Sequence, residues 1–500
     1  MPLGRLLKET GRQGGFNFSY NSEALPEDSL VSLSARNKTV EEVLDLVLSR
    51  PLEYLEAGNY IILRPRGHTL ALTLEDISER GNTYLVSGVV TDPSTGTGLP
   101  DASVYERQLL LATLTDEKGR FLLRVRDRYK TVALTASKAL YEDTTMFIQL
   151  QGVVVLPGKK QGRKPGKWFS GQDENGDVER TGLGMFLLSS RQRVQSLNLR
   201  EFFTESPVQA SLTPGLSSQG RMSAQVVNRV SINLIGGYTA GVDGMEMAGV
   251  FNMNKKSVEH VQLAGAFNIV GGSVRGLQAA GAHNTVLGSV KGVQIGGAVN
   301  ITRGIVEGVQ LAGAVNYAGQ LKGVQVGIVN IADSSAGYSI GLVNIIRKSG
   351  FLRVSLFTNE SLQANLAFKS GTSKIFAILQ GGITPGPRKL YAYGAGFGKE
   401  LLLKHGFSLQ PELLFQEVYQ GSSIYNNQLY RFNLGLHYRA AKKIHVFAGP
   451  SFNIWNSNQG SPVDGYGFIP SARRGSFGLN GHGLRGWIGW KAGISILRPL

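Results

Sequence analysis

Carboxamide side chains recur at fixed spacing in the middle of the chain, and their types and spacing could do chemistry. Asparagines are spaced by 16 residues over five units and then by 14, and four of them follow a glutamine by six residues. The set comprises Gln262, Gln278, Gln294, Gln310, Asn252, Asn268, Asn284, Asn300, Asn316, Asn330 and Asn344. Repeated carboxamides can bind sugars or ice, but they more often satisfy one another and the backbone. We therefore expect a structural ladder.

Other polar residues do not combine into a reactive centre. Glu246 stands where the later units have Gln, His283 is isolated, and the seven histidines are scattered. Asp92 and Asp116 lie beside turn glycines, where such side chains usually accept local backbone N–H bonds. Catalysis needs a nucleophile with its base, paired carboxylates or a metal cluster. We expect no enzyme activity, no cofactor and no metal.

The repeated phrase predicts strands. In "VQIGGAVNI", residues 293–301, apolar side chains alternate with Gln294, Gly296, Ala298 and Asn300, and a period of two indicates a strand. Seven units at a regular spacing indicate an array. Two architectures fit. A β-solenoid would stack each carboxamide on its copy in the next coil, whereas a membrane barrel would use each unit as one strand. We slightly prefer the barrel over residues 201–350, because the flanking segments look like barrel strands.

Residues 351–500 contain eight segments that alternate over eight or more residues and are separated by polar or Gly- and Pro-containing breaks. Trp455, Trp487 and Trp490 lie near the expected strand ends, where an aromatic girdle would stand. The gap from 456 to 485 reads as an extracellular loop. The expected fold is mainly β: a small α+β domain, a β-sandwich, and a large antiparallel barrel-like region that contains the repeats.

The first 66 residues predict a small α+β domain. Thr39 and Glu42 form a capping box before a helix, and "YLEAGNYIIL" predicts a hairpin turning at 58–59. The segments "GFNFSYNSEAL", "VSLSARNKTVEEVLDLVL" and "LEYLEAGNYIIL" resemble the secretin and TonB short N-terminal domain. That resemblance implies a periplasmic domain that contacts partner proteins. The family opens with a strand that precedes this chain's first helix, so we expect the true start, with its signal peptide, to lie upstream.

Residues 80–150 predict a β-sandwich, and residues 151–200 a linker that is rich in Pro, Gly and charge. The order of strands and turns resembles the carboxypeptidase regulatory-like domain, a sandwich that is not catalytic. The resemblance rests on Gly88, Asp92, Thr95, Gly96, Leu99, Pro100, Ala102, Val104, Thr115, Asp116, Gly119, Phe121, Tyr141 and Glu142. Units of the GxQxGxxN type over 245–345 also resemble surface repeats of Gram-negative outer-membrane proteins.

The charge balance points to an anionic neighbour. The net charge is +16, yet the basic residues are dispersed and no nucleic-acid recognition signature accompanies them. We expect outer-membrane lipid or lipopolysaccharide as a partner, a periplasmic or inner-membrane regulatory protein as a possible second partner, and no nucleic acid. The function we expect is that of a non-enzymatic outer-membrane β-barrel surface protein with periplasmic N-terminal domains. The alternative is a surface adhesin whose β-solenoid binds glycan.

Overall fold

The computed structural model is mainly β and divides into two compact units, one of residues 1–162 and 194–200 and the other of residues 163–193 and 201–500. It describes residues 2–14, 16–20, 29–32, 39–47, 52–57, 60–65, 68–139, 141–150, 154–157, 177–199, 202–469, 477–479 and 484–499. No helix in these ranges is long and apolar enough to cross a membrane.

The N-terminal part has the small α+β arrangement that the sequence predicts. Its elements are α1 (Leu3–Gly14), β1 (Asn17–Tyr20), α2 (Val40–Val47), β2 (Leu52–Ala57) and β3 (Tyr60–Pro65). β3 pairs parallel with β1 and antiparallel with β2. The capping box is confirmed, because Thr39 N–H donates to Glu42 Oε2 (2.9 Å) and Glu42 N–H donates to Thr39 Oγ1 (3.2 Å). The expected turn at 58–59 lies outside the described residues.

Two sheets follow and enclose one apolar core. One sheet has the order β5–β6–β9 and the other β13–β12–β10–β7–β8, while β4 pairs with β11. The strands are β4 (His68–Thr69), β5 (Ala71–Arg80), β6 (Thr83–Thr91), β7 (Ser103–Glu106), β8 (Leu111–Leu114), β9 (Arg120–Arg126), β10 (Thr131–Ser137), β11 (Tyr141–Glu142), β12 (Thr144–Gln149) and β13 (Val154–Pro157). Val86, Leu123 and Leu134 are among the side chains buried between the sheets.

The segment expected as a linker carries regular structure at both of its ends. β13 extends the sandwich past residue 150, and a helical stretch precedes the repeats: η1 (Val178–Arg180), α3 (Gly182–Leu187) and α4 (Ser190–Asn198). Thr181 caps α3, its Oγ1 accepting from Gly184 N–H at 3.0 Å. The basic run and most of the acidic loop noted in the sequence lie outside the described residues.

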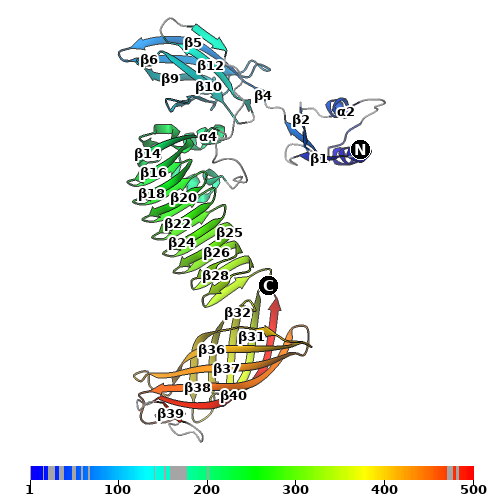
Figure 1. The fold of residues 1–500 in the computed structure, drawn as a ribbon, viewed down its shortest axis with the longest axis vertical. Helices are drawn as coiled ribbons and strands as arrows, with labels where there is room; N and C mark the ends of the chain where they lie inside the picture. The colour runs from blue at the N-terminus through cyan, green and yellow to red at the C-terminus, as the bar shows by residue number, and fades with distance from the viewer. Residues whose placement is uncertain are drawn as a thin grey trace. The chain divides into compact units, whose positions relative to one another are not determined.

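The repeats form a parallel β-solenoid. Each 16-residue unit contributes two strands, and each strand pairs in parallel with its copy one coil later, so that Gln278 lies opposite Gln294 and Asn284 opposite Asn300. Figure 1 shows these coils as a stack. The elements are β14 (Thr204–Thr213), β15 (Leu216–Ser217), η2 (Gly220–Gln225), β16 (Val226–Asn233), β17 (Gly236–Thr239), β18 (Gly241–Ala248), β19 (Phe251–Asn254), β20 (Val258–Ala264), β21 (Phe267–Val270), β22 (Val274–Ala280), β23 (His283–Val286), β24 (Val290–Gly296), β25 (Val299–Ala312), β26 (Val315–Leu321), β27 (Val324–Val326), β28 (Val329–Ser335), β29 (Tyr338–Ile340) and β30 (Val343–Ile346).

This register corrects our preference for barrel strands in the repeats and agrees with the solenoid alternative. Adjacent barrel strands would run antiparallel, whereas here like positions meet in parallel. The alternation along "VQIGGAVNI" is also interrupted, because the chain turns between β24 and β25 and Ala298 is exposed on the turn. Gln294 and Asn300 nevertheless both point inward, one from each strand of the coil.

The described residues between 351 and 499 form an antiparallel barrel, as the sequence predicts for this part of the chain. Among the described residues, eight long strands pair in sequence order, and β31 pairs with β40 to close the sheet. They are β31 (Phe351–Asn359), β32 (Ala364–Gly371), β33 (Phe376–Thr384), β34 (Leu390–Gly398), β36 (Phe407–Tyr419), β37 (Asn427–Arg439), β38 (Ile444–Ser457) and β40 (Leu484–Pro499), with β35 (Leu401–Leu402) on β36 and β39 (Phe477–Leu479) on β40. They coincide with the eight alternating segments, and Figure 1 shows them closing on themselves.

Candidate functional site

The predicted asparagines line the inside of the solenoid as one continuous hydrogen-bonded column. Each Nδ2 donates to the Oδ1 of the next asparagine along the chain, at 2.9–3.0 Å, from Asn252 through to Asn344. Most also donate to a backbone carbonyl of the next coil, as Asn300 does to Leu311 O at 2.7 Å. The side chains are fully buried. Burial leaves these amides with protein partners and no open surface for a ligand.

The glutamines form a second buried column that runs in the opposite sense. Gln310 Nε2 donates to Gln294 Oε1 at 2.7 Å, and the donors continue toward the N-terminus until Gln262 donates to Glu246 Oε2 at 2.8 Å. Gln325, which the sequence analysis did not single out, adds one more rung at 2.8 Å. A column of donors that all point one way needs an acceptor at its end, and Glu246 supplies it.

Glu246 is the one acid inside this column, and its surroundings explain its place. Its oxygens also accept from Asn254 Nδ2 (2.9 Å), Ser231 Oγ (3.1 Å) and Asn233 Nδ2 (3.3 Å). Burial raises the pKa of Glu246 above its ordinary value, although these hydrogen bonds act in the opposite direction. The four side chains that donate to this carboxyl group are all uncharged, so Glu246 ends the column as a structural acceptor whose protonation depends on pH.

The barrel interior holds charged groups that the sequence analysis missed. Glu412 accepts from Lys369 Nζ and from Lys491 Nζ, each at 2.5 Å, and all three side chains are buried. Two further ion pairs lie in the barrel: Arg353–Glu400 (3.0 Å) and Arg431–Glu360 (3.2 Å). The sequence does carry a signal for this cluster. Lys369, Glu412 and Lys491 each stand at a position of an alternating strand whose side chain faces the barrel interior.

Many inward polar atoms of the barrel have no protein partner. In the described part of the chain, these include both amide atoms of Gln416, both ring nitrogens of His437, and the Oδ1 atoms of Asn365, Asn433 and Asn453. No asparagine or glutamine of the two solenoid columns is in this state. Buried polar groups are nearly always hydrogen-bonded to protein or to water. The polar part of the barrel interior therefore needs water, whereas the two carboxamide columns of the solenoid satisfy themselves.

The outside of the barrel is apolar. Along β36, odd-numbered residues face out and even-numbered residues face in, so that Leu413 is 63% exposed while Leu414 and Gln416 are buried. On β40, Ile488 and Ile496 are likewise exposed, at 77% and 59%. A continuous belt of this kind is far larger than the apolar patches that soluble monomers usually leave in water.

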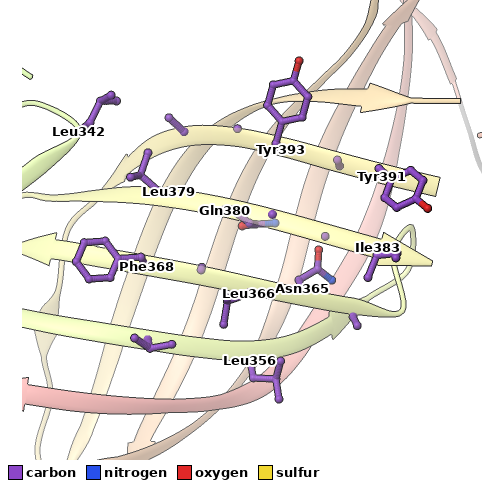
Figure 2. Close-up of a pocket in the computed structure, with 18 residues that line it drawn as sticks. Leu342, Leu356, Asn365, Leu366, Phe368, Leu379, Gln380, Ile383, Tyr391 and Tyr393 are labelled. Carbon is purple, nitrogen blue, oxygen red and sulfur yellow. The ribbon is translucent and has the colours of Figure 1, made fainter. Parts of the chain in front are cut away.

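A shallow apolar groove of about 980 Å³ crosses the outer face of β31 to β34. Small residues such as Gly381 and Ala395 make room between larger neighbours, which include Leu366 and Tyr393. Figure 2 shows Leu342, from the last solenoid coil, at one end of the groove and Tyr391 at the other. The last coil reaches the barrel directly, because Ser370 Oγ accepts from Asn344 N–H at 3.0 Å.

The acids of the sandwich take the local role that the sequence predicts. Asp92 Oδ1 accepts from Ser94 N–H at 2.8 Å, and Asp116 Oδ1 accepts from Lys118 and Arg120 N–H at 2.9 and 2.8 Å. Within the ranges that the structure describes, no three His, Asp or Glu residues gather as a metal site would require.

Comparisons with known proteins place the chain in no family. Neither family models, nor curated proteins, nor solved structures give a match to it.

Proposed function

We propose that this chain is a non-enzymatic outer-membrane β-barrel surface protein, with its N-terminal domains in the periplasm in contact with an envelope partner. The observation that carries the proposal is the distribution of side chains on the closed barrel, whose outer face is apolar while its charged and most of its polar side chains lie inside, beside apolar clusters. That distribution is the one a strand-built membrane protein needs, because a closed sheet pairs all its backbone groups and leaves only side chains to face hydrocarbon.

The size of the barrel supports anchoring and surface display. Eight strands make an interior just wide enough for side chains to fill. Lys369, Glu412 and Lys491 occupy part of that interior together with Arg353 and Arg431. A wide solute channel does not fit such a lumen.

The resemblances of the first 150 residues support the rest of the proposal. A short secretin- and TonB-type domain followed by a regulatory-like sandwich implies contact with a protein partner on the periplasmic side. Such contact would suit signalling or docking.

The adhesin alternative has the architecture of the repeats in its favour, since they form a β-solenoid, but the side chains that it assigns to glycan binding are not accessible. The carboxamides to which it assigns glycan binding, Gln294 and Gln310 among them, are buried in the solenoid. Their replacement by Ala is therefore expected to weaken the coil stack, with or without a glycan present.

Reconstitution tests the proposal. The full chain should co-float with lipid vesicles and show a heat-dependent change in gel mobility, as stable barrels do. Leu413→Arg, on the outward face of β36, should reduce both, since Arg on the lipid face costs about 2–4 kcal/mol near the bilayer midplane. Leu122→Arg on the sandwich surface, at a side chain 50% exposed, is the matched control and should change neither. A full chain that stays monomeric in plain buffer and ignores vesicles would overturn the proposal.

A further inference from the structure

One outer face of the solenoid is apolar from coil to coil. Three columns of side chains stack along it, and none of their members is buried. We call these columns the apolar stripe. The first contains Met245, Val261, Leu277, Val293, Val309, Val324 and Tyr338, the second Met247, Leu263, Ala279, Ile295, Leu311, Val326 and Ile340, and the third Val250, Ala266, Ala282, Ala298, Ala314, Ile328 and Leu342.

The stripe is long and contains almost no hydrogen-bonding side chain. Its seven coils, at the roughly 4.8 Å spacing of paired strands, extend over roughly 30 Å. The Tyr338 hydroxyl is the one polar side-chain group in its columns. A column of charged residues borders it, with ion pairs between successive coils such as Arg275–Glu259 (3.1 Å) and Lys322–Glu307 (3.0 Å). Surfaces that face water usually carry charged side chains, and this face has none over seven coils, so we infer that an apolar partner covers it.

The stripe ends on the barrel groove. In the third column, Ala282 N–H donates to Ala266 O at 2.9 Å and Ala298 N–H to Ala282 O at 2.9 Å, and the column continues to Leu342, whose N–H donates to Ile328 O at 3.0 Å. Leu342 also lines the apolar groove on β31 to β34. The stripe and the outer surface of the barrel are thus one continuous apolar track.

The composition of the stripe favours hydrocarbon over a protein surface as its occupant. Protein interfaces depend on Trp, Tyr and Arg anchors in pockets, and Leu and Val are under-represented among the residues that dominate binding. The stripe consists mostly of Val, Leu, Ile and Ala, its central coils carry no aromatic side chain, and its strands are already paired on both sides. An acyl chain needs only such a surface.

We propose that the apolar stripe binds the hydrocarbon chain of an envelope lipid and connects it with the lipid-facing surface of the barrel. The barrel end of this track rests on the proposed membrane location, whereas the binding of a chain by the solenoid itself does not. The stripe would shield an acyl chain from water beyond the bilayer surface, as a lipid-handling protein must.

The absence of cysteine from the sequence makes a direct test possible. Single-cysteine variants of the full chain, Ile295→Cys in the stripe, Lys291→Cys in the charged column of the same coil and Leu366→Cys on the barrel groove, are labelled with a small fluorophore. Each is mixed with phosphatidylglycerol vesicles whose acyl chains carry bromine, a quencher. We expect quenching at 295 and 366 to be several-fold stronger than at 291.

The outcomes separate the two proposals. If the label at Leu366→Cys is quenched but the label at Ile295→Cys is quenched no more strongly than that at Lys291→Cys, the lipid stripe is overturned and the membrane barrel is supported. Quenching at 295 without 366 supports the stripe and overturns the barrel's location. Quenching at neither overturns both. Nitroxides at 295 that lie close together in detergent would show that a second copy covers the stripe, which also overturns the proposal.

A second pair of variants guards against adventitious quenching. Ile295→Glu places a charge in the stripe, and it should abolish most of the quenching of a label at Val326→Cys, two coils away on the same column. Lys291→Glu changes charge in the same coil outside the stripe and should leave that quenching intact. If both variants reduce the quenching at Val326→Cys equally, or if neither variant reduces it, an acyl chain does not lie along the columns.

Discussion

The solenoid and the barrel both bury polar side chains beside apolar clusters and expose apolar side chains outside, yet they satisfy the buried polar groups in different ways. In the solenoid, identical amides at identical heights hydrogen-bond to their own copies, as Asn284 does to Asn300 at 2.9 Å. In the barrel, neighbouring positions differ, and the Lys369–Glu412 ion pair is contacted by Asn433, whose Oδ1 has no protein partner. In the repeats, buried amides find hydrogen-bond partners in their own copies and need no water. In the barrel, where the sequence does not repeat, ion pairs and water have to supply the partners of the buried polar groups.

The largest effect should come from breaking the charge cluster in the barrel. Glu412→Leu leaves the Lys369 and Lys491 ammonium groups buried near each other without their acceptor, and removal of one partner of a buried pair costs about 3–5 kcal/mol. The urea midpoint of the detergent-solubilised barrel, followed by tryptophan fluorescence, measures the loss. Replacement of all three residues by apolar ones should recover most of it, and an unchanged midpoint for the single variant would mean that water already solvates the ammonium groups.

A somewhat smaller loss is expected in the solenoid for Asn300→Leu. The substitution removes the donor to Asn316 Oδ1 and to Leu311 O, and it removes the acceptor for Asn284 Nδ2. Asn284 Nδ2 keeps its hydrogen bond to Ile295 O, so two acceptors lose their donor. Each buried group left unsatisfied costs about 1–3 kcal/mol, and with two such groups we expect a total of about 3 kcal/mol. Hydrogen exchange of peptides covering residues 284–316 reports it as faster local opening. Exchange rates equal to those of the unaltered chain would contradict a continuous column.

Glu246→Gln tests whether the stability of the solenoid depends on pH through the one carboxyl group in its glutamine column. Because burial raises the pKa of folded Glu246, the folded state holds its proton longer than the unfolded chain, whose value is near 4.5. The stability from this group is complete below that value and is lost as the pH rises toward and through the folded pKa. The unaltered solenoid should therefore be more stable at acidic than at neutral pH in urea titrations.

The matched control for this pH effect is the glutamine variant itself. Gln at 246 keeps an acceptor for Gln262 Nε2 and has no proton to lose in this range, so its difference from the unaltered chain should grow with pH in its favour. If the difference in unfolding free energy between the two proteins stays constant with pH, the carboxyl group is ionised equally in the folded and the unfolded state.

The smallest effect is expected for Asn453→Leu, which repeats the Asn300 substitution inside the barrel. Asn453 Nδ2 donates to Ser451 Oγ at 3.1 Å, while its Oδ1 has no protein partner. Water can take over for Ser451, so the loss should stay below about 1 kcal/mol, the net value of one ordinary hydrogen bond. A urea midpoint that falls as far as that of Glu412→Leu would indicate a dry lumen and remove the contrast between the two interiors.

Local sequence signals predicted the elements well, for a physical reason. Alternation along "LYRFNLGLHYRA" requires only that one face of a strand be apolar, and the capping box of Thr39 and Glu42 is complete within four residues. The direction of pairing was not accessible in this way. A period of two gives the same pattern for a strand of either architecture, and only the partner of each strand separates a solenoid from a barrel.

The candidate site shows the same limit. The carboxamide columns were visible because each member repeats at a fixed spacing. The Lys369–Glu412–Lys491 cluster joins residues 43 and 79 positions apart, which nothing local connects. The apolar stripe lies in the same repeats, but its side chains, such as Val293 and Ile295, would face outward in barrel strands as well, so the alternation alone does not identify it.

A nitroxide scan along β36 tests the membrane barrel most directly. Labels at single cysteines from position 409 to 418, in the full chain reconstituted in lipid vesicles, are compared for collisions with oxygen, which concentrates in hydrocarbon, and with a water-soluble nickel complex. We predict a period of two, with oxygen favoured at the outward positions Leu413 and Phe415 and suppressed at the inward positions Leu414 and Gln416. If labels at the outward positions collide with the nickel complex as often as a label at an exposed residue of the sandwich, the membrane barrel is contradicted.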